Sequence, residues 1–62
     1  MLIRQIERFL NETRMSWTRF GRLAARDPRF VADLRNGRVP RAATQSRVES
    51  FMTRYQEDAH AL

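Results

Sequence analysis

Apolar residues recur at intervals of three and four along most of this 62-residue chain, with polar residues between them. This spacing places the apolar positions on one side of a helix and the polar positions on the other. It predicts helices over about residues 2–12, 17–25, 28–36 and 42–58. The sequence therefore predicts a single all-α domain over residues 1–62, with four helices and no strands.

Local signals mark the ends of these helices. Ser16 is a good N-cap for the second helix. Asp27 and Pro28 form the sharpest signal in the chain, because Asp caps a helix through its carboxylate and Pro fits the first helical position. Gly37 is expected to close the third helix in a left-handed conformation. The fourth helix is expected to begin between residues 41 and 45, with Thr44 as the best cap.

The common phasing of the apolar residues predicts one core. Phe20, Leu23 and Ala24 are expected on the inner side of the second helix, with Met15 packing at its start. Gly21 inside that helix indicates close packing, since Gly costs about 1 kcal/mol relative to Ala in a helix. The expected core consists of Phe20, Phe30, Val31, Leu34, Val48 and Phe51.

The second and third predicted helices are separated by a very tight turn. Such a pair is the arrangement of a helix-turn-helix, whose second helix enters the DNA major groove. The charge supports this interpretation: net charge is +5, and all twelve cations are Arg. Residues 14–41 carry a balance of +6, whereas residues 1–13 are neutral and residues 42–62 carry −1. A concentrated positive field favours a polyanion, although an acidic protein or a membrane surface satisfies the same arithmetic.

Other classes of protein find no support in the sequence. The chain has no Cys and a single His, so no metal site or disulfide is expected. No apolar run is long enough to cross a bilayer. No catalytic motif is present, so we expect no enzyme, no cofactor and no small-molecule ligand. The expected location is the cytoplasm, in association with the nucleoid.

The stretch MSWTRFGRLAARDPRFVADLRNG, residues 15–37, resembles the helix-turn-helix of the Cro and lambda-repressor (Xre-like) superfamily. More narrowly, FGR, DPRFVADLRNGR and the later ATxxRV resemble short bacterial and prophage regulators. The resemblance covers roughly residues 2–55 and implies a lambda-repressor-like fold. Three features depart from the pattern: no Gly occupies the turn near Ala25 and Arg26, Trp17 replaces a frequent Gln, and Pro28 occupies a base-contacting position although it cannot hydrogen bond.

The resemblance implies that the third helix reads bases. Arg29 can bind a guanine edge in a bidentate manner, or instead contact a phosphate or pair with Asp33 four residues later. Asp33 can accept from cytosine, but we favour a role in orienting Arg29 or an Arg of the second helix. Ala32 either touches a thymine methyl or leaves room for the DNA. Pro28 stands where a base-contacting side chain can lie, and Asn36 shares the exposed side of this helix.

The remaining candidate residues are expected to fix position on the phosphates. Ser16, Trp17 and Thr18 begin the second helix, where free N–H groups suit a phosphate. For Trp17 we favour plain packing over stacking on the backbone or on a partner. Arg38 and Arg41 flank the loop after the third helix, either as phosphate ligands or as solvated charges. Three arginines are expected on one stripe of the second helix, as phosphate contacts or partners of Asp33: Arg19, Arg22 and Arg26.

The function expected is that of a sequence-specific regulator of transcription, most simply a repressor, that binds a palindromic operator in double-stranded DNA. A homodimer is expected, joined through the fourth helix, the first helix or both, because one chain of this size has a small core and one reading helix covers few base pairs. Met52 and Tyr55 on the fourth helix have little chain to cover them. The alternatives are an excisionase-like or architectural DNA-binding protein, and an antiactivator that binds another regulator.

Overall fold

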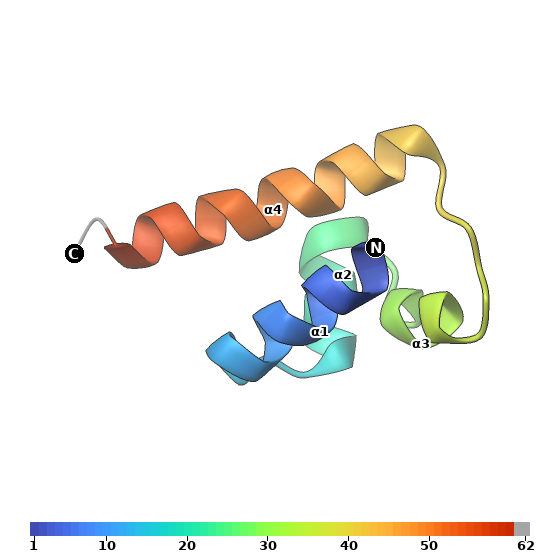
Figure 1. Cartoon of the computed structure of the whole chain (residues 1–62), viewed down its shortest axis with the longest axis horizontal. Coiled ribbons are helices and arrows are strands. Elements are labelled where there is room, and N and C mark those ends of the chain that lie inside the picture. The colour runs from blue at the N-terminus through green and yellow to red at the C-terminus, as the bar shows by residue number, and fades with distance from the viewer. Residues whose placement is uncertain (61–62) are drawn as a thin grey trace.

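A computed structural model describes residues 1–60 of the chain, with side chains described as far as Asp58. Over this range the chain forms four α-helices and no strand: α1 (Leu2–Thr13), α2 (Trp17–Ala25), α3 (Phe30–Arg35) and α4 (Ala42–His60). Figure 1 shows the three shorter helices grouped on one side of α4, which runs across them as the longest element. A loop connects the end of α3 to the start of α4 (Figure 1).

The core lies between the three short helices and the first half of α4. It includes the fully buried Phe20 and Phe30, from α2 and α3 respectively. Leu34 and Phe51 are only partly buried, but they pack against this cluster, so the predicted core is confirmed as one cluster. Its buried members are Ile6, Phe9, Leu10, Phe20, Ala24, Phe30, Val31 and Val48.

Aromatic rings connect α1, α2 and α4. The Phe9 ring centroid lies 5.5 Å from that of Phe20 and 6.1 Å from that of Phe51, and the Phe20 and Phe51 centroids are 5.6 Å apart. Tyr55, one turn further along α4, lies 5.3 Å from Phe9. Tilted and edge-on arrangements at these separations are favourable because the positive ring edge meets the negative ring face. These contacts fix the long α4 on the short helices.

One residue assigned to the core by its spacing is not there. Leu23 was expected on the inner side of α2, but it is 52% exposed. The buried face of α2 is centred on Phe20, Gly21 and Ala24. Because successive residues of a helix are rotated by about 100°, Leu23 falls at the edge of that face, beyond the part that α4 covers.

Two predicted boundaries need correction. The helix expected from residue 28 begins at Phe30, because the Phe30 N–H donates to the Asp27 carbonyl oxygen (3.1 Å) and closes a tight turn through Pro28 and Arg29. Thr44 is not the cap of α4. The helix already begins at Ala42, and the Gln45 N–H donates to the Arg41 carbonyl oxygen at 2.9 Å. The predicted range of α2 is confirmed, α1 and α4 extend one and two residues beyond their predicted ends, and α3 ends at Arg35, one residue before its predicted end.

None of the helices described in residues 1–60 combines the length and the apolar character needed to cross a membrane.

Candidate nucleic-acid interface

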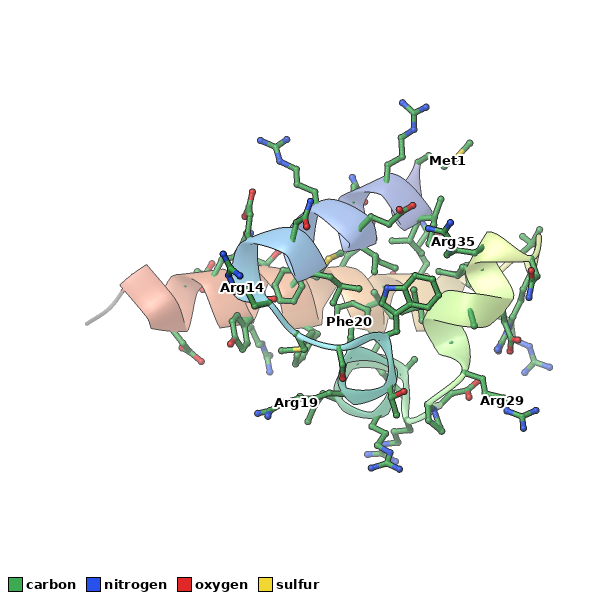
Figure 2. All side chains as sticks on the ribbon, turned by 90° about the horizontal axis from the view of Figure 1, so that it is seen from below. Met1, Arg14, Arg19, Phe20, Arg29 and Arg35 are labelled. Carbon is green, nitrogen blue, oxygen red and sulfur yellow. The ribbon has the colours of Figure 1, made fainter. Side chains whose placement is uncertain are left out.

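The exposed face of α2 is an arginine stripe, formed by Arg19, Arg22 and Arg26. The first two are exposed on the side of the helix opposite the buried Phe20 and Ala24, and Arg26 follows at its C-terminal end. The sequence of α2 contains no carboxylate that could neutralise them. Figure 2 shows Arg19 extending outward at the α2 edge of the molecule, away from α1. The stripe can therefore present several guanidinium groups to one extended anion.

The turn between α2 and α3 is held by a close backbone approach. Arg26 adopts a left-handed conformation (φ 55°), and its N–H donates to the Gly21 carbonyl oxygen. The Asp27 N–H donates to the same oxygen at 3.0 Å. A Cβ at position 21 would overlap the Asp27 carbonyl oxygen, so only Gly permits this turn. The close packing predicted from Gly21 is confirmed, and Arg26 occupies the conformation that Gly adopts more readily.

Asp27 organises the start of α3 with both carboxylate oxygens. Its Oδ1 accepts from the Arg29 backbone N–H (3.0 Å), so Asp27 stabilises the turn before α3; the predicted role as the helix cap is wrong, because Arg29 is the N-cap and no side chain caps α3. Its Oδ2 accepts from Arg38 Nη1, also at 3.0 Å. The pKa of Asp27 lies below its usual value, first because of the Arg29 backbone hydrogen bond and then because of the hydrogen bond from Arg38.

Arg38 ties the loop after α3 back to the turn before it. Its Nη1 also donates to Asp33 Oδ2 (3.2 Å), and its guanidinium carbon lies 5.7 Å from the centre of the Phe30 ring. The Asp27 and Asp33 carboxylates raise the pKa of Arg38, with the hydrogen bond to Asp27 as the largest cause. Asp33 was expected to orient Arg29 or an Arg of α2. This expectation is wrong, because the chain reversal after α3 brings Arg38 to it instead.

Gly37 makes that reversal possible. It has a φ of 101°, as predicted for the residue that closes this helix. The Gly37 N–H donates to the Leu34 carbonyl oxygen (3.1 Å) and the Arg38 N–H to the Asp33 carbonyl oxygen (2.9 Å). This pair of bonds is a Schellman motif, which satisfies the last carbonyl groups of α3. The same motif delivers Arg38 to the two Asp side chains.

The candidate base-reading side of α3 is exposed at its ends and partly covered in the middle. Arg29 and Asn36 are exposed, whereas Ala32 and Asp33 are half-buried. Figure 2 shows the Arg29 side chain pointing away from the body of the molecule beside α3, on the opposite side of α2 from Arg19. Arg29 is exposed, and the carboxylate of Asp33, one of its expected partners, pairs with Arg38 instead. Pro28 is exposed in the turn between Arg26 and Arg29.

A second cluster, which spacing did not predict, joins three helices at the start of α2. The Arg35 guanidinium carbon lies 5.0 Å from the centre of the Trp17 ring, and Arg35 Nη1 donates to Glu7 Oε2 at 3.0 Å. Trp17 remains 43% exposed. Packing was the favoured role for Trp17, and the ring does pack, against an Arg cation. No sequence signal links these positions, which come from α1, α2 and α3.

The other candidate residues lie at the beginnings of α2 and α4. Ser16 caps α2, as predicted, by accepting the Arg19 N–H on its Oγ (3.1 Å). Thr18 is exposed in the first turn of α2, and Arg41 is exposed immediately before α4. Ser16 and Thr18 belong to the same helix as the arginine stripe, whereas Arg41 lies beyond the loop that Arg38 anchors.

Comparison of the chain with protein-family models, curated proteins and solved structures finds no match.

Proposed function

We propose that this protein is a sequence-specific regulator of transcription that binds double-stranded DNA through a lambda-repressor-like helix-turn-helix formed by α2 and α3. Its simplest mode of action is repression at a palindromic operator occupied by a homodimer. One observation carries the proposal. Arg19, Arg22, Arg26 and Arg29 are all exposed along α2 and the turn into α3, and α2 itself contains no carboxylate.

An extended edge of guanidinium groups suits a phosphate backbone better than it suits a compact anion. Each Arg that neutralises a phosphate releases condensed counterions, which supplies affinity without reading sequence. The arginine stripe of α2 is the part of the molecule suited to this task. Ser16 and Thr18 at the start of α2 and Arg41 before α4 extend the same type of contact.

Sequence reading falls to the exposed side of α3. Arg29 lies at the start of that side, and its planar guanidinium matches the O6 and N7 acceptors of guanine in the major groove. Ala32 is small enough to let the helix approach the bases closely. Asn36, exposed at the end of α3, is the second candidate reader, since an amide matches the N6 and N7 groups of adenine. Arg38 has five N–H donors and uses Nη1 for its two carboxylates, so its other donors suit a phosphate.

Selection of bound duplexes from a random pool tests this proposal. We expect an enriched inverted repeat, with half-sites about one helical turn apart. A dimer with about four to six phosphate contacts per protomer gives a log–log slope of affinity against salt of about −7 to −11. An affinity that does not change with salt contradicts the proposal. If duplexes are bound and strongly bent but the selected pool shows no common sequence, the protein is an architectural DNA-binding protein. If no DNA is bound at all, the antiactivator is favoured.

A matched pair of variants locates the binding edge. Arg22→Ala removes one cation from the arginine stripe and is expected to weaken binding to all duplexes. Arg8→Ala removes one cation from α1, where Arg8 pairs with Glu12 four residues later (3.4 Å). Both changes lower the net charge equally. If the two variants lose the same affinity, the effect is one of total charge, and the proposed edge is wrong.

A further inference from the structure

An open groove runs between the end of α2 and the C-terminal half of α4. It is lined by Leu23 from α2 and by Arg47, Phe51, Arg54, Tyr55 and Asp58 from α4. Leu23 is 52% exposed and Tyr55 is 39% exposed. Figure 1 shows that α4 continues past the ends of α1 and α2.

The charges along this groove have both signs, with Arg47 and Arg54 preceding Asp58 along α4. Arg47 lies near the beginning of α4, and Asp58 lies in its last turn, about 16 Å away along the helix axis. Glu57 adds a second carboxylate to that turn. Acidic residues at a helix C-terminus oppose the helix dipole, whose negative end lies there. Within the described chain, these two carboxylates make no ion pair.

A second copy of the chain complements this pattern when its α4 runs antiparallel. A two-fold axis close to residues 52 and 53 places Arg47 opposite the partner's Asp58, and the symmetry repeats the pair at the other end. The same operation brings Arg54 beside the partner's Phe51, where a guanidinium can lie on the ring. The positive end of each helix dipole then meets the acidic end of the other helix. An acidic peptide fits less well, because Asp58 would repel it.

We infer that this groove is the homodimer interface of the protein, with two α4 helices packed antiparallel about a two-fold axis. Leu23 and Tyr55 of both copies form its apolar centre, and the two Arg47–Asp58 pairs close its ends. Such an isologous interface is self-complementary in charge, as two-fold symmetry requires. The inference specifies the dimer in the proposed function, but it depends only on contacts between copies and not on DNA.

Charge reversal in DNA-free protein tests this interface. Sedimentation equilibrium of the full chain, from low to high micromolar concentration, measures the dimer Kd. Arg47→Asp and Asp58→Arg each replace both pairs by like charges, and each is expected to raise the Kd at least about tenfold. The double variant R47D/D58R restores opposite charges and is expected to restore dimerisation. Glu49→Arg is the control, since Glu49 lies on α4 but does not line this groove.

Each other result contradicts the inference. A wild-type protein that stays monomeric at high micromolar concentration shows that the groove is not a dimer interface. Single variants that dimerise as tightly as the wild type show that the interface lies elsewhere. Weakened single variants without rescue in the double variant show that the antiparallel pairing is wrong. Circular dichroism of every variant confirms that the helices remain intact. DNA binding is measured separately, so failure of the dimer and failure of the proposed function are distinguishable.

Discussion

The arginines along α2 and the arginines at the C-terminal end of α3 differ in the groups that surround them. Arg19, Arg22 and Arg26 lie along α2, which has no acidic residue. Arg35 and Arg38 instead contact both carboxylates and rings. Arg35 joins Glu7 to Trp17, and Arg38 bridges Asp27 and Asp33 above Phe30.

This difference separates two functions within one basic segment. Arginines on α2 are available to an external anion, whereas Arg35 connects α3 to α1 and α2, and Arg38 holds the turn and the loop in place. The charge density along the sequence does not distinguish the arginines on α2 from those that form ion pairs. The ion pairs are partly exposed, so each one contributes little to stability by itself. Their value lies in geometry, because they fix the turn on which Arg29 is displayed.

Gly21→Ala is expected to have the largest effect, because it disrupts the turn between α2 and α3. The new Cβ would overlap the Asp27 carbonyl oxygen, so Asp27 must move away from Arg38. We expect a decrease of about 3 kcal/mol in the free energy of unfolding, which is most of the stability of a domain this small. Thermal and urea unfolding measure it. Arg22→Ala, at the neighbouring exposed position, is the control and should stay within about 0.5 kcal/mol of the wild type.

Arg29→Ala distinguishes reading from positioning at the edge of the arginine stripe. If Arg29 binds a guanine, its removal costs about 1–3 kcal/mol at the selected operator and relaxes the preference at one base pair of each half-site. Arg22→Ala should instead weaken all duplexes alike and make the salt slope shallower by about 0.9 for each phosphate that is no longer neutralised. Titrations of operator and random duplex at several salt concentrations measure both. Uniform weakening by Arg29→Ala would assign Arg29 to the phosphate backbone.

Arg14→Gly and Arg26→Gly test the arginine stripe at two residues that both adopt a left-handed conformation, with φ values of 57° and 55°. Gly removes the steric cost of that conformation but has greater freedom in the unfolded chain. We expect each change to stabilise the fold by about 0.5–1 kcal/mol. Only Arg26→Gly should also weaken DNA binding, since Arg14 lies outside the arginine stripe. Equal weakening of DNA binding in both variants would contradict the assignment of the stripe.

The smallest expected effect is the acid response of the Asp27–Arg38 contact. Since the folded-state pKa of Asp27 is lowered, its hydrogen bonds stabilise the fold above about pH 4, the usual Asp range, and this contribution disappears as the pH falls through the lowered value. Asp27→Asn is expected to lower the melting temperature at neutral pH and to flatten its decline in acid. Melting curves from neutral pH down to acid pH measure both effects. An acid decline that is as steep in Asp27→Asn as in the wild type would exclude Asp27 as its source.

Local patterns are sufficient where a neighbour within the same turn or helix decides the structure. Ser16 caps α2, Gly37 closes α3 and Asp27 caps the turn before it, all through bonds to nearby backbone groups. The predicted start of α3 lies two residues too early because the Asp27–Pro28 signal is compatible with both a helical first turn and the tighter turn that forms. The prediction for Leu23 is wrong because helical spacing gives the side of a residue but not the width of the face that α4 covers.

The four helices, most of their ends and the concentration of arginine between residues 14 and 41 follow from the amino-acid sequence alone. These depend on periodicity, capping chemistry and composition, which act over a few residues. Which arginines form ion pairs across the fold depends on how the helices pack. Arg35 meets Glu7 across 28 positions of sequence, and Arg38 meets Asp27 across eleven. Such pairs form because packed helices bring distant side chains together, and no local pattern in the chain encodes that proximity.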